Sequence, residues 1–233
     1  MVAIFRRELG SYFKSMIGYV YLAVFFFFAG YAFMNSSLYT STTDLSSVFS
    51  FLFTVILFIA PIVTMRLFSE DRKLKTDQAI LTAPVSLYGL IFGKFFGAFV
   101  FYGLGVSITL VYAVVVSAFG LFGWFSLLAN LFGLLLLGAA LISIGMFISA
   151  LTEDQIVAAV GSFAVMLLLI LVDSFASGVS NPFLSNLLTQ ISFNGRYSSF
   201  TMGMIDIMNV LFFVSVTGIF IFLTVRVFEK RRW

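Results

Sequence analysis

The residues of this chain that come nearest to binding a nucleotide lie in the stretch Gly89-Leu-Ile-Phe-Gly93-Lys94-Phe95. A loop that holds phosphate needs Gly-x-x-x-x-Gly-Lys followed by Ser or Thr, after a strand and before a helix. Here the glycines are too close together, no hydroxyl follows the lysine, and apolar sequence surrounds the motif. The sequence therefore predicts that this chain has no ATP site. If ATP drives the protein, another chain supplies that site.

The side chains that most often catalyse reactions or bind transition metals are absent, because the chain contains no cysteine and no histidine. Their absence excludes disulfides, Cys/His zinc sites, haem ligation through histidine, thiol nucleophiles and histidine acid–base catalysis. We therefore expect no catalytic residue, no metal site and no cofactor in this chain, and no enzymatic activity of its own.

The charged residues all lie at or near the borders of long apolar runs. Lys94 is expected to extend its amine to the membrane surface, Asp173 ends the fifth run, and Asp206 begins the sixth. Carriers driven by protons or sodium usually place ionisable groups near the middle of the bilayer. This distribution disfavours a carrier that is powered by an ion gradient.

Six apolar runs must position these residues, over 17–34, 48–65, 95–118, 127–150, 156–172 and 207–225. Each is close to the roughly 20 residues that cross about 30 Å of hydrocarbon. The chain is 61% hydrophobic and 10% charged, and its mean hydropathy is +1.13, whereas soluble proteins carry about 25% charged residues. The sequence predicts an all-α membrane protein with six transmembrane helices, in a single domain over 1–233.

Basic residues predict which way the chain crosses the membrane, because short loops rich in Lys and Arg stay in the cytoplasm. Of the 13 basic residues, only Arg196 lies on the side predicted to face outward. The others are Arg6, Arg7, Lys14, Arg66, Arg72, Lys73, Lys75, Lys94, Arg226, Lys230, Arg231 and Arg232. Both termini are therefore predicted to be cytoplasmic.

Two segments outside the runs are expected to lie at the membrane surface. Residues 1–16 repeat apolar residues at helical spacing and predict an interfacial amphipathic helix, although a simple basic flank remains the alternative. The first apolar run is too long for a signal peptide, so we expect it to be retained. The segment 173–206 predicts two short helices that dip into the outer leaflet, since Pro182 can begin a helix and Asn194-Gly195 interrupts it.

The segment 68–86 interleaves acidic and basic residues between the second and third runs. We predict a short amphipathic helix at the cytoplasmic surface over 69–86, and a solvated charged loop is the alternative. Pro84 disfavours helix at the residue before it, and Ser86 can cap the helix that leads into the third run.

This segment resembles the region after the second span in type-2 ABC exporter permeases. The residues that match the family pattern are Phe68, Glu70, Asp71, Arg72, Thr76, Asp77, Gln78, Leu81, Thr82, Pro84, Val85, Ser86, Gly93 and Lys94. The chain departs from the pattern at Lys75, where many members have Gly, and at Asp77-Gln78, where x-Glu is common. Thr76-Asp77-Gln78 is similar to the branch of permeases associated with gliding motility.

The resemblance extends over nearly the whole chain and implies a permease subunit in a multi-pass cell membrane protein of a prokaryote. Such a subunit pairs with a second permease subunit, in a homo- or heterodimer, and rests on two copies of an ABC ATPase that bind ATP and Mg. An accessory membrane protein is a further partner that such a complex can include, and nucleic acid is not expected. The cargo stays unassigned.

The resemblance also implies which residues contact the ATPase. In the family, the segment between spans two and three is a coupling helix that sits in a groove of that subunit. The residues carried over are Glu70, Asp71, Arg72, Thr76, Asp77, Thr82 and Pro84, with a second contact at Thr152, Glu153 and Asp154. Glu70 and Asp71 have an alternative role, in ion pairs with Arg66 or Lys73 of the same chain.

Gly89, Gly93 and Gly97 stand four residues apart and let helices approach closely. Packing within one subunit and a seam between two subunits are both consistent with this spacing. Two other functions remain open from the sequence. One is an ion-coupled secondary carrier or channel, which would transport without nucleotide, and the other is a membrane scaffold.

Overall fold

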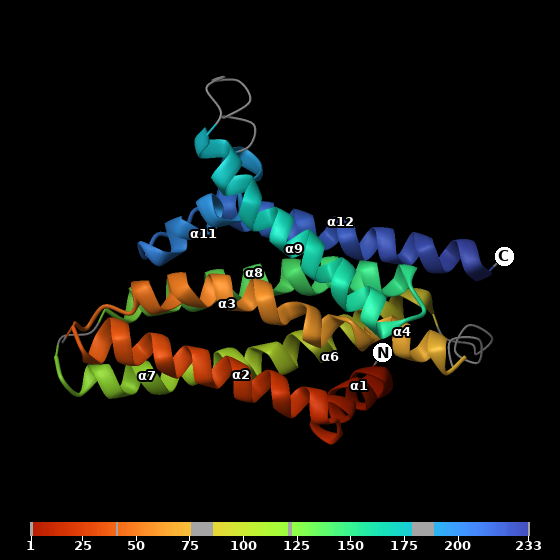
Figure 1. Ribbon diagram of the computed structural model, residues 1–233, viewed down its shortest axis with the longest axis horizontal. Coiled ribbons are helices and arrows are strands. Elements are labelled where there is room, and N and C mark those ends of the chain that lie inside the picture. Colours follow the sequence, from red (N-terminus) through yellow and green to blue (C-terminus); the bar gives the residue numbers. More distant parts are fainter. Residues whose placement is uncertain (1, 41, 76–85, 121–122, 179–188, 233) are drawn as a thin grey trace.

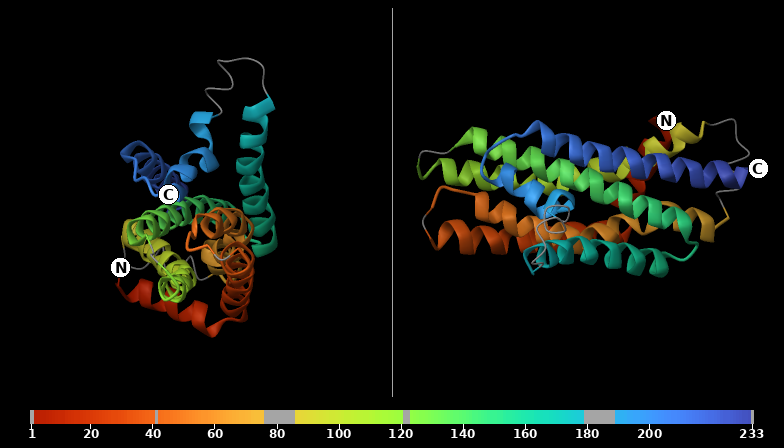
Figure 2. Two further views of the ribbon diagram at one scale, coloured as in Figure 1. Left: turned by 90° about the vertical axis from the view of Figure 1, so that its left-hand side faces the viewer. Right: turned by 90° about the horizontal axis from the view of Figure 1, so that it is seen from above.

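The computed structural model describes residues 2–40, 42–75, 86–120, 123–178 and 189–232. This part of the chain is helical and contains no strand. In chain order the helices are α1 (Val2–Lys14), α2 (Met16–Phe33), η1 (Met34–Leu38), α3 (Ser46–Thr64), α4 (Arg66–Lys73), α6 (Leu87–Val106), α7 (Ile108–Ser117), α8 (Trp124–Leu151), α9 (Gln155–Gly178), α11 (Phe193–Thr201) and α12 (Ile207–Arg232). Helices α2, α3, α6, α7, α8 and α12 run roughly along one long axis, whereas α9 rises obliquely from the bundle and α1 lies across its end (Figures 1 and 2).

Six of these helical stretches are long and apolar enough to cross a membrane, as the sequence predicted. They are Met16–Leu38, Ser46–Lys73, Leu87–Ser117, Trp124–Leu151, Gln155–Val172 and Ile207–Lys230. The third begins earlier than the apolar run because Ser86 caps it: the Ser86 hydroxyl accepts a hydrogen bond from the Gly89 amide at 3.2 Å. The second continues through α4, so the charged helix after span two is joined directly to that span.

The centre of the bundle is formed by α3 and α8, most of whose residues are buried, whereas fewer than a quarter of the residues of α9 and α12 are buried. Glycines in α8 allow this packing. A Cβ atom at Gly138 would lie 2.1 Å from the Tyr102 ring of α6, and one at Gly145 would lie 2.1 Å from the Thr64 hydroxyl of α3. Only a residue without a side chain lets these neighbours approach so closely.

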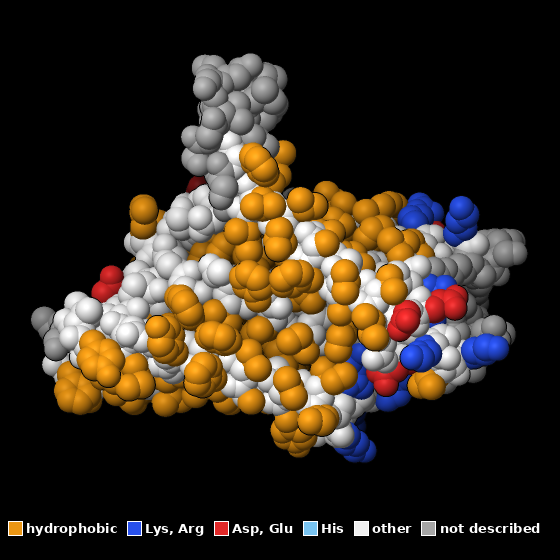
Figure 3. All heavy atoms as spheres, in the orientation of Figure 1, with side chains coloured by type: hydrophobic (Ala, Val, Ile, Leu, Met, Phe, Trp, Pro, Cys, Tyr) orange, Lys and Arg blue, Asp and Glu red, His pale blue; other side chains and the backbone are white. Residues whose placement is uncertain are grey.

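The two ends of the bundle differ in charge. Both termini lie at the same end, together with α1 and α4 (Figures 1 and 2). In the space-filling view, hydrophobic side chains cover the flank, and Lys, Arg, Asp and Glu side chains gather at the end that carries α4 (Figure 3). We call this end, formed by α1, α4 and the α8–α9 turn at 152–154, the charged end. The opposite end carries the loops between η1 and α3 and between α7 and α8.

Candidate functional site

A buried cluster of ion pairs joins α1, α4 and α6 at the charged end. The Lys94 amine lies 2.8 Å from Glu8 Oε1 and 2.7 Å from Asp71 Oδ2, and it donates a hydrogen bond to the Leu67 carbonyl at 2.5 Å. The Lys94 side chain is 2% exposed. Its amine also lies over the Phe68 ring, 5.2 Å from the centroid. The expectation that Lys94 extends its amine to the membrane surface is therefore wrong. The amine is instead buried among Glu8 and Asp71 of the same chain.

The cluster depends on a close approach of α1 to α6. A Cβ atom at Gly97 would lie 2.9 Å from Glu8 Cβ, so glycine is needed for α1 to lie against α6 at this point. Arg7 adds a second cation, 3.0 Å from Glu8 and 3.7 Å from Asp71. Gly97 thus packs within one chain, which favours that alternative over a seam between subunits. Gly93 is buried and Gly89 is partly exposed.

The junction of α3 and α4 is fixed by a serine of α8. The Ser149 hydroxyl accepts hydrogen bonds from the amides of Phe68 and Ser69, at 3.0 and 3.1 Å, and donates to the Met65 carbonyl at 3.0 Å. A hydroxyl inserted between backbone groups in this way interrupts a helix and sets the direction of the next turn. Ser149 was not predicted as a functional residue, since a serine in an apolar run carries no signal of such a contact.

A second set of contacts brings together the two segments predicted to meet the ATPase. Arg72 of α4 lies 2.6 Å from Glu153 Oε1 and donates to the Ala150 carbonyl at 3.4 Å. Glu70 pairs with Arg66 at 3.0 Å, one helical turn away. Glu70, Asp71 and Arg72 therefore all make ion pairs within the chain, and for Glu70 the partner is one that the sequence analysis named as the alternative.

Arg66 also ties α4 to α1. It donates to the Ser11 hydroxyl at 3.4 Å, and its guanidinium lies 5.5 Å from the centre of the Tyr12 ring. The Tyr12 hydroxyl donates to the Val63 carbonyl at 2.8 Å. Burial raises the pKa of Tyr12 well above its ordinary value, and the nearby carboxylate of Glu8 raises it further. Tyr12 is therefore a neutral donor at physiological pH.

The charged end also exposes side chains at the tip of α4 and in the α8–α9 turn. Lys73, Leu74 and Lys75 are exposed at the end of α4, and Leu74 exposes 65% of its surface. Glu153 and Asp154 are exposed in the α8–α9 turn, where Thr152 is half-buried. Four predicted contact residues, Thr76, Asp77, Thr82 and Pro84, lie outside the described residues.

The described part of the chain contains no group of three or more acidic side chains that could hold a metal ion. At the charged end, α4 is bonded to α1, α6 and α8, and it presents exposed charged and apolar side chains at its tip.

Comparison with known proteins gives the chain a family. A comparison with curated proteins finds no match. The family model described as ABC-2 family transporter protein matches residues 2–233, which is nearly the whole chain. Together with the six apolar helices, this match identifies a multi-pass membrane protein that serves as a permease component in transport. The chain belongs to the ABC-2 family of transporter proteins.

Proposed function

We propose that this chain is the permease subunit of an ATP-driven exporter and that it receives movement from a separate ATPase at its charged end. A second permease subunit completes the translocation path, and two ATPase subunits bind ATP and Mg. The charged end then faces the cytoplasm of a prokaryotic cell, in agreement with the distribution of basic residues. The branch associated with gliding motility remains part of this proposal.

The observation that carries the proposal is the way in which α4 is held. A helix that transmits force must move together with the helices that it drives. Lys94 joins α4 to α1 and α6, and Ser149 joins α4 to α8. A push on α4 would therefore act on three other helices at once, and α4 itself continues from α3.

The same contacts divide the predicted ATPase-contact residues into two roles. Glu70, Asp71 and Arg72 pair with residues of this chain, so we assign them to positioning α4. The exposed tip of α4, Lys73 and Leu74, is available to a partner. Asp154 offers a second point of contact in the α8–α9 turn, together with the residues of 76–85 that the resemblance implies.

The test is retention of the ATPase that co-purifies with the chain from native membrane. The double variant Lys73→Glu, Leu74→Asp reverses charge and removes apolar surface at the tip of α4, and we expect it to lose the ATPase. The matched control lies on the part of α12 that reaches the charged end (Figure 1). It exchanges the two members of an ion pair, Arg226→Glu with Glu229→Arg, so that the pair is kept. This control should retain the ATPase.

Two results would contradict the proposal. One is a tip variant that retains the ATPase, and still stimulates its ATP hydrolysis, as well as the control variant does. The other is transport by the reconstituted chain that is driven by an ion gradient without nucleotide, which would instead indicate a secondary carrier. The purified chain alone should hydrolyse no ATP.

A further inference from the structure

Arg196 is the only basic residue on the side that the sequence predicts to face outward, and the structure fixes it between two helices. It belongs to α11, which lies with the beginning of α12 in the half of the bundle away from the charged end (Figure 1). The Arg196 guanidinium donates from Nε and Nη2 to the Gln190 carbonyl, both at 3.3 Å, and from Nη1 to Asn209 Oδ1 at 3.1 Å. It also lies over the Phe212 ring of α12, 5.5 Å from the centroid.

A buried amide holds the guanidinium in one orientation. Asn209 of α12 is 4% exposed, and its Nδ2 atom donates to the Ser199 hydroxyl at 3.0 Å. Its oxygen is thereby directed at Arg196, since a flipped amide would present N–H groups to the guanidinium. Both partners of Asn209 lie on α11. A polar side chain buried in α12 therefore positions the arginine of α11.

The charge of Arg196 is not neutralised by any carboxylate among the described residues, since none of their ion pairs includes it. The segment 179–188, which precedes Gln190 in the chain, contains no acidic residue. The bonds to Gln190 and Asn209 use three of the five N–H groups of the guanidinium, so two remain. Arg196 is partly exposed, and its bonds to Gln190 lie at the surface. An oriented cation of this kind matches an anion with two acceptor oxygens.

The depth of Arg196 in the membrane indicates which anion it meets. The last candidate span begins at Ile207, so Asn209 and the guanidinium bonded to it lie at the level of the first turn of that span. The ends of spans lie at the lipid headgroups, and the anion at that depth is the phosphodiester of a phospholipid. Apolar side chains are exposed on both sides of Arg196 in the sequence, at Ile191, Met202, Met204, Ile207 and Met208. Acyl chains can therefore lie against the elements that hold the guanidinium.

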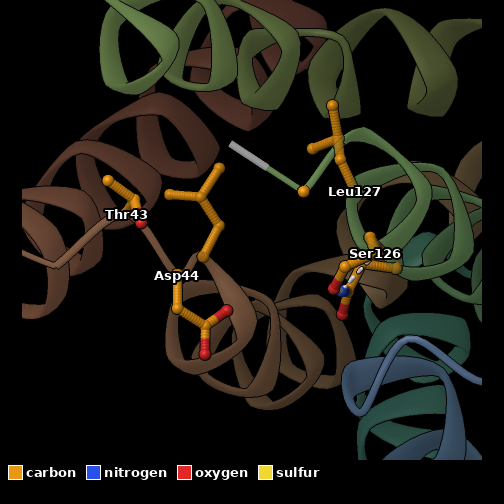
Figure 4. Close-up of a pocket in the computed structure, with 7 residues that line it drawn as sticks. Thr43, Asp44, Ser126 and Leu127 are labelled. Carbon is orange, nitrogen blue, oxygen red and sulfur yellow. Dashed lines mark hydrogen bonds between the residues drawn. The ribbon is translucent and has the colours of Figure 1, made fainter. Parts of the chain in front are cut away.

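A pocket between the beginnings of α3 and α8 is a separate polar feature away from the charged end (Figure 4). Its described lining includes Asp44 and Ser126 but no Lys or Arg. A carboxylate repels a phosphate, so this pocket does not compete with Arg196 for an anion.

From these observations we propose that Arg196 binds the phosphodiester group of a membrane phospholipid at the junction of α11 and α12. The two remaining N–H groups of the guanidinium donate to phosphate oxygens, a geometry that arginine favours over lysine. Asn209 is a positioning residue, because it holds the guanidinium and does not itself meet the lipid. This inference does not depend on the proposed function.

The test locates a bound phospholipid on the chain. Purified chain in detergent is mixed with phosphatidylglycerol that carries a photoreactive group in its headgroup, and the labelled peptides are identified by mass spectrometry. We expect label on α11 and on the first turns of α12. Arg196→Gln should reduce this label about tenfold, since tenfold corresponds to roughly one hydrogen bond to a charged group. Label at the basic residues of the charged end should not change, and it serves as the internal control.

Asn209→Asp separates lipid binding from a purely structural role of Arg196. This variant keeps an acceptor for the guanidinium and adds a carboxylate beside it, so α11 and α12 stay joined while the label should fall. Arg226→Gln is the matched control, because Arg226 also lies over a phenylalanine of α12 but already pairs with Glu229. It should leave the label on α11 unchanged. The unfolding temperature of each variant shows whether it is folded.

Competition on the wild-type chain identifies the group that is recognised. Unlabelled phosphatidylglycerol should displace the label from α11, and diacylglycerol with the same acyl chains should not, because only the first carries a phosphate. The proposal is overturned if diacylglycerol competes equally well, or if a folded Arg196→Gln or Asn209→Asp variant is labelled on α11 like the wild type. It is also overturned if soluble glycerol phosphate displaces the label as well as the lipid does, since the occupant would then be a free phosphate compound.

Discussion

Replacing Lys94 by methionine tests whether the charged end is held together by its buried ion pairs. Methionine keeps much of the volume of the lysine stem but removes the amine. Two carboxylates then face each other with little access to water, since the side chains of Glu8 and Asp71 are 11% and 18% exposed. Breaking a buried pair by removing one partner costs about 3–5 kcal/mol.

Arg7 offsets part of this loss. It already lies 3.0 Å from Glu8 and 3.7 Å from Asp71. Its side chain is 52% exposed, and an exposed ion pair contributes only about 0–1 kcal/mol. We therefore expect Lys94→Met to lower the free energy of unfolding by about 2–4 kcal/mol. For a chain of this size, that corresponds to a fall of roughly 4–16 °C in the unfolding temperature.

The assay is thermal unfolding in detergent, followed by circular dichroism. Lys14→Met is the matched control, because Lys14 is an exposed lysine at the end of α1, and it should unfold with the wild type. The triple variant Lys94→Met, Glu8→Gln, Asp71→Asn removes all three charges together and should recover much of the loss. The reasoning is refuted if Lys94→Met unfolds at the temperature of the control, or if the triple variant is no more stable than the single one.

Three further substitutions test other contacts, each by thermal unfolding. Gly145→Ala should lower the free energy of unfolding by about 1–3 kcal/mol through overpacking against Thr64 of α3. Gly218→Ala should have no such effect, because the space around Gly218 is open. An equal loss of stability in the two variants would contradict the packing argument. Ser149→Ala should lower the free energy of unfolding by about 2–3 kcal/mol because it leaves buried backbone amides unpaired. The control is Ser143→Ala, since the Ser143 hydroxyl bonds to a carbonyl of its own helix. An equal loss in the two variants would contradict the role assigned to Ser149. Tyr12→Phe should lower the free energy of unfolding by about 1 kcal/mol at pH 7. Because the folded pKa of Tyr12 is raised, the stabilisation by this hydroxyl is complete below the unfolded pKa of about 10 and is lost as the pH rises further. A stability difference between variant and wild type that stays constant above pH 10 would refute this assignment.

Features that depend on neighbouring residues could be predicted from the sequence. The six spans follow from local hydropathy, and the Ser86 cap follows from a serine placed just before an apolar helix. The pair of Glu70 with Arg66 was foreseen as an alternative because its members stand one turn apart.

Features that depend on distant residues could not be predicted. Lys94 was predicted to reach the membrane surface, because its partner Glu8 lies 86 residues away and no local pattern indicates that the two meet. Asp71 pairs with Lys94 rather than with the nearby Lys73, and no sequence spacing distinguishes the two. The contact of Ser149 with the α3–α4 junction also joins residues about 80 positions apart. Such contacts are decided by how the helices cross, which local patterns do not encode.

The direct continuation of α3 into α4 has a mechanical consequence. The stretch Ser46–Lys73 contains 28 residues, which corresponds to about 42 Å of helix at 1.5 Å per residue, with one interruption at Met65. One tip of this stretch carries Leu74, and the other follows Asp44. Because Ser149 bonds the backbone on both sides of the α3–α4 junction, an axial shift at the tip of α4 would act on α8 at this junction as well as on α3.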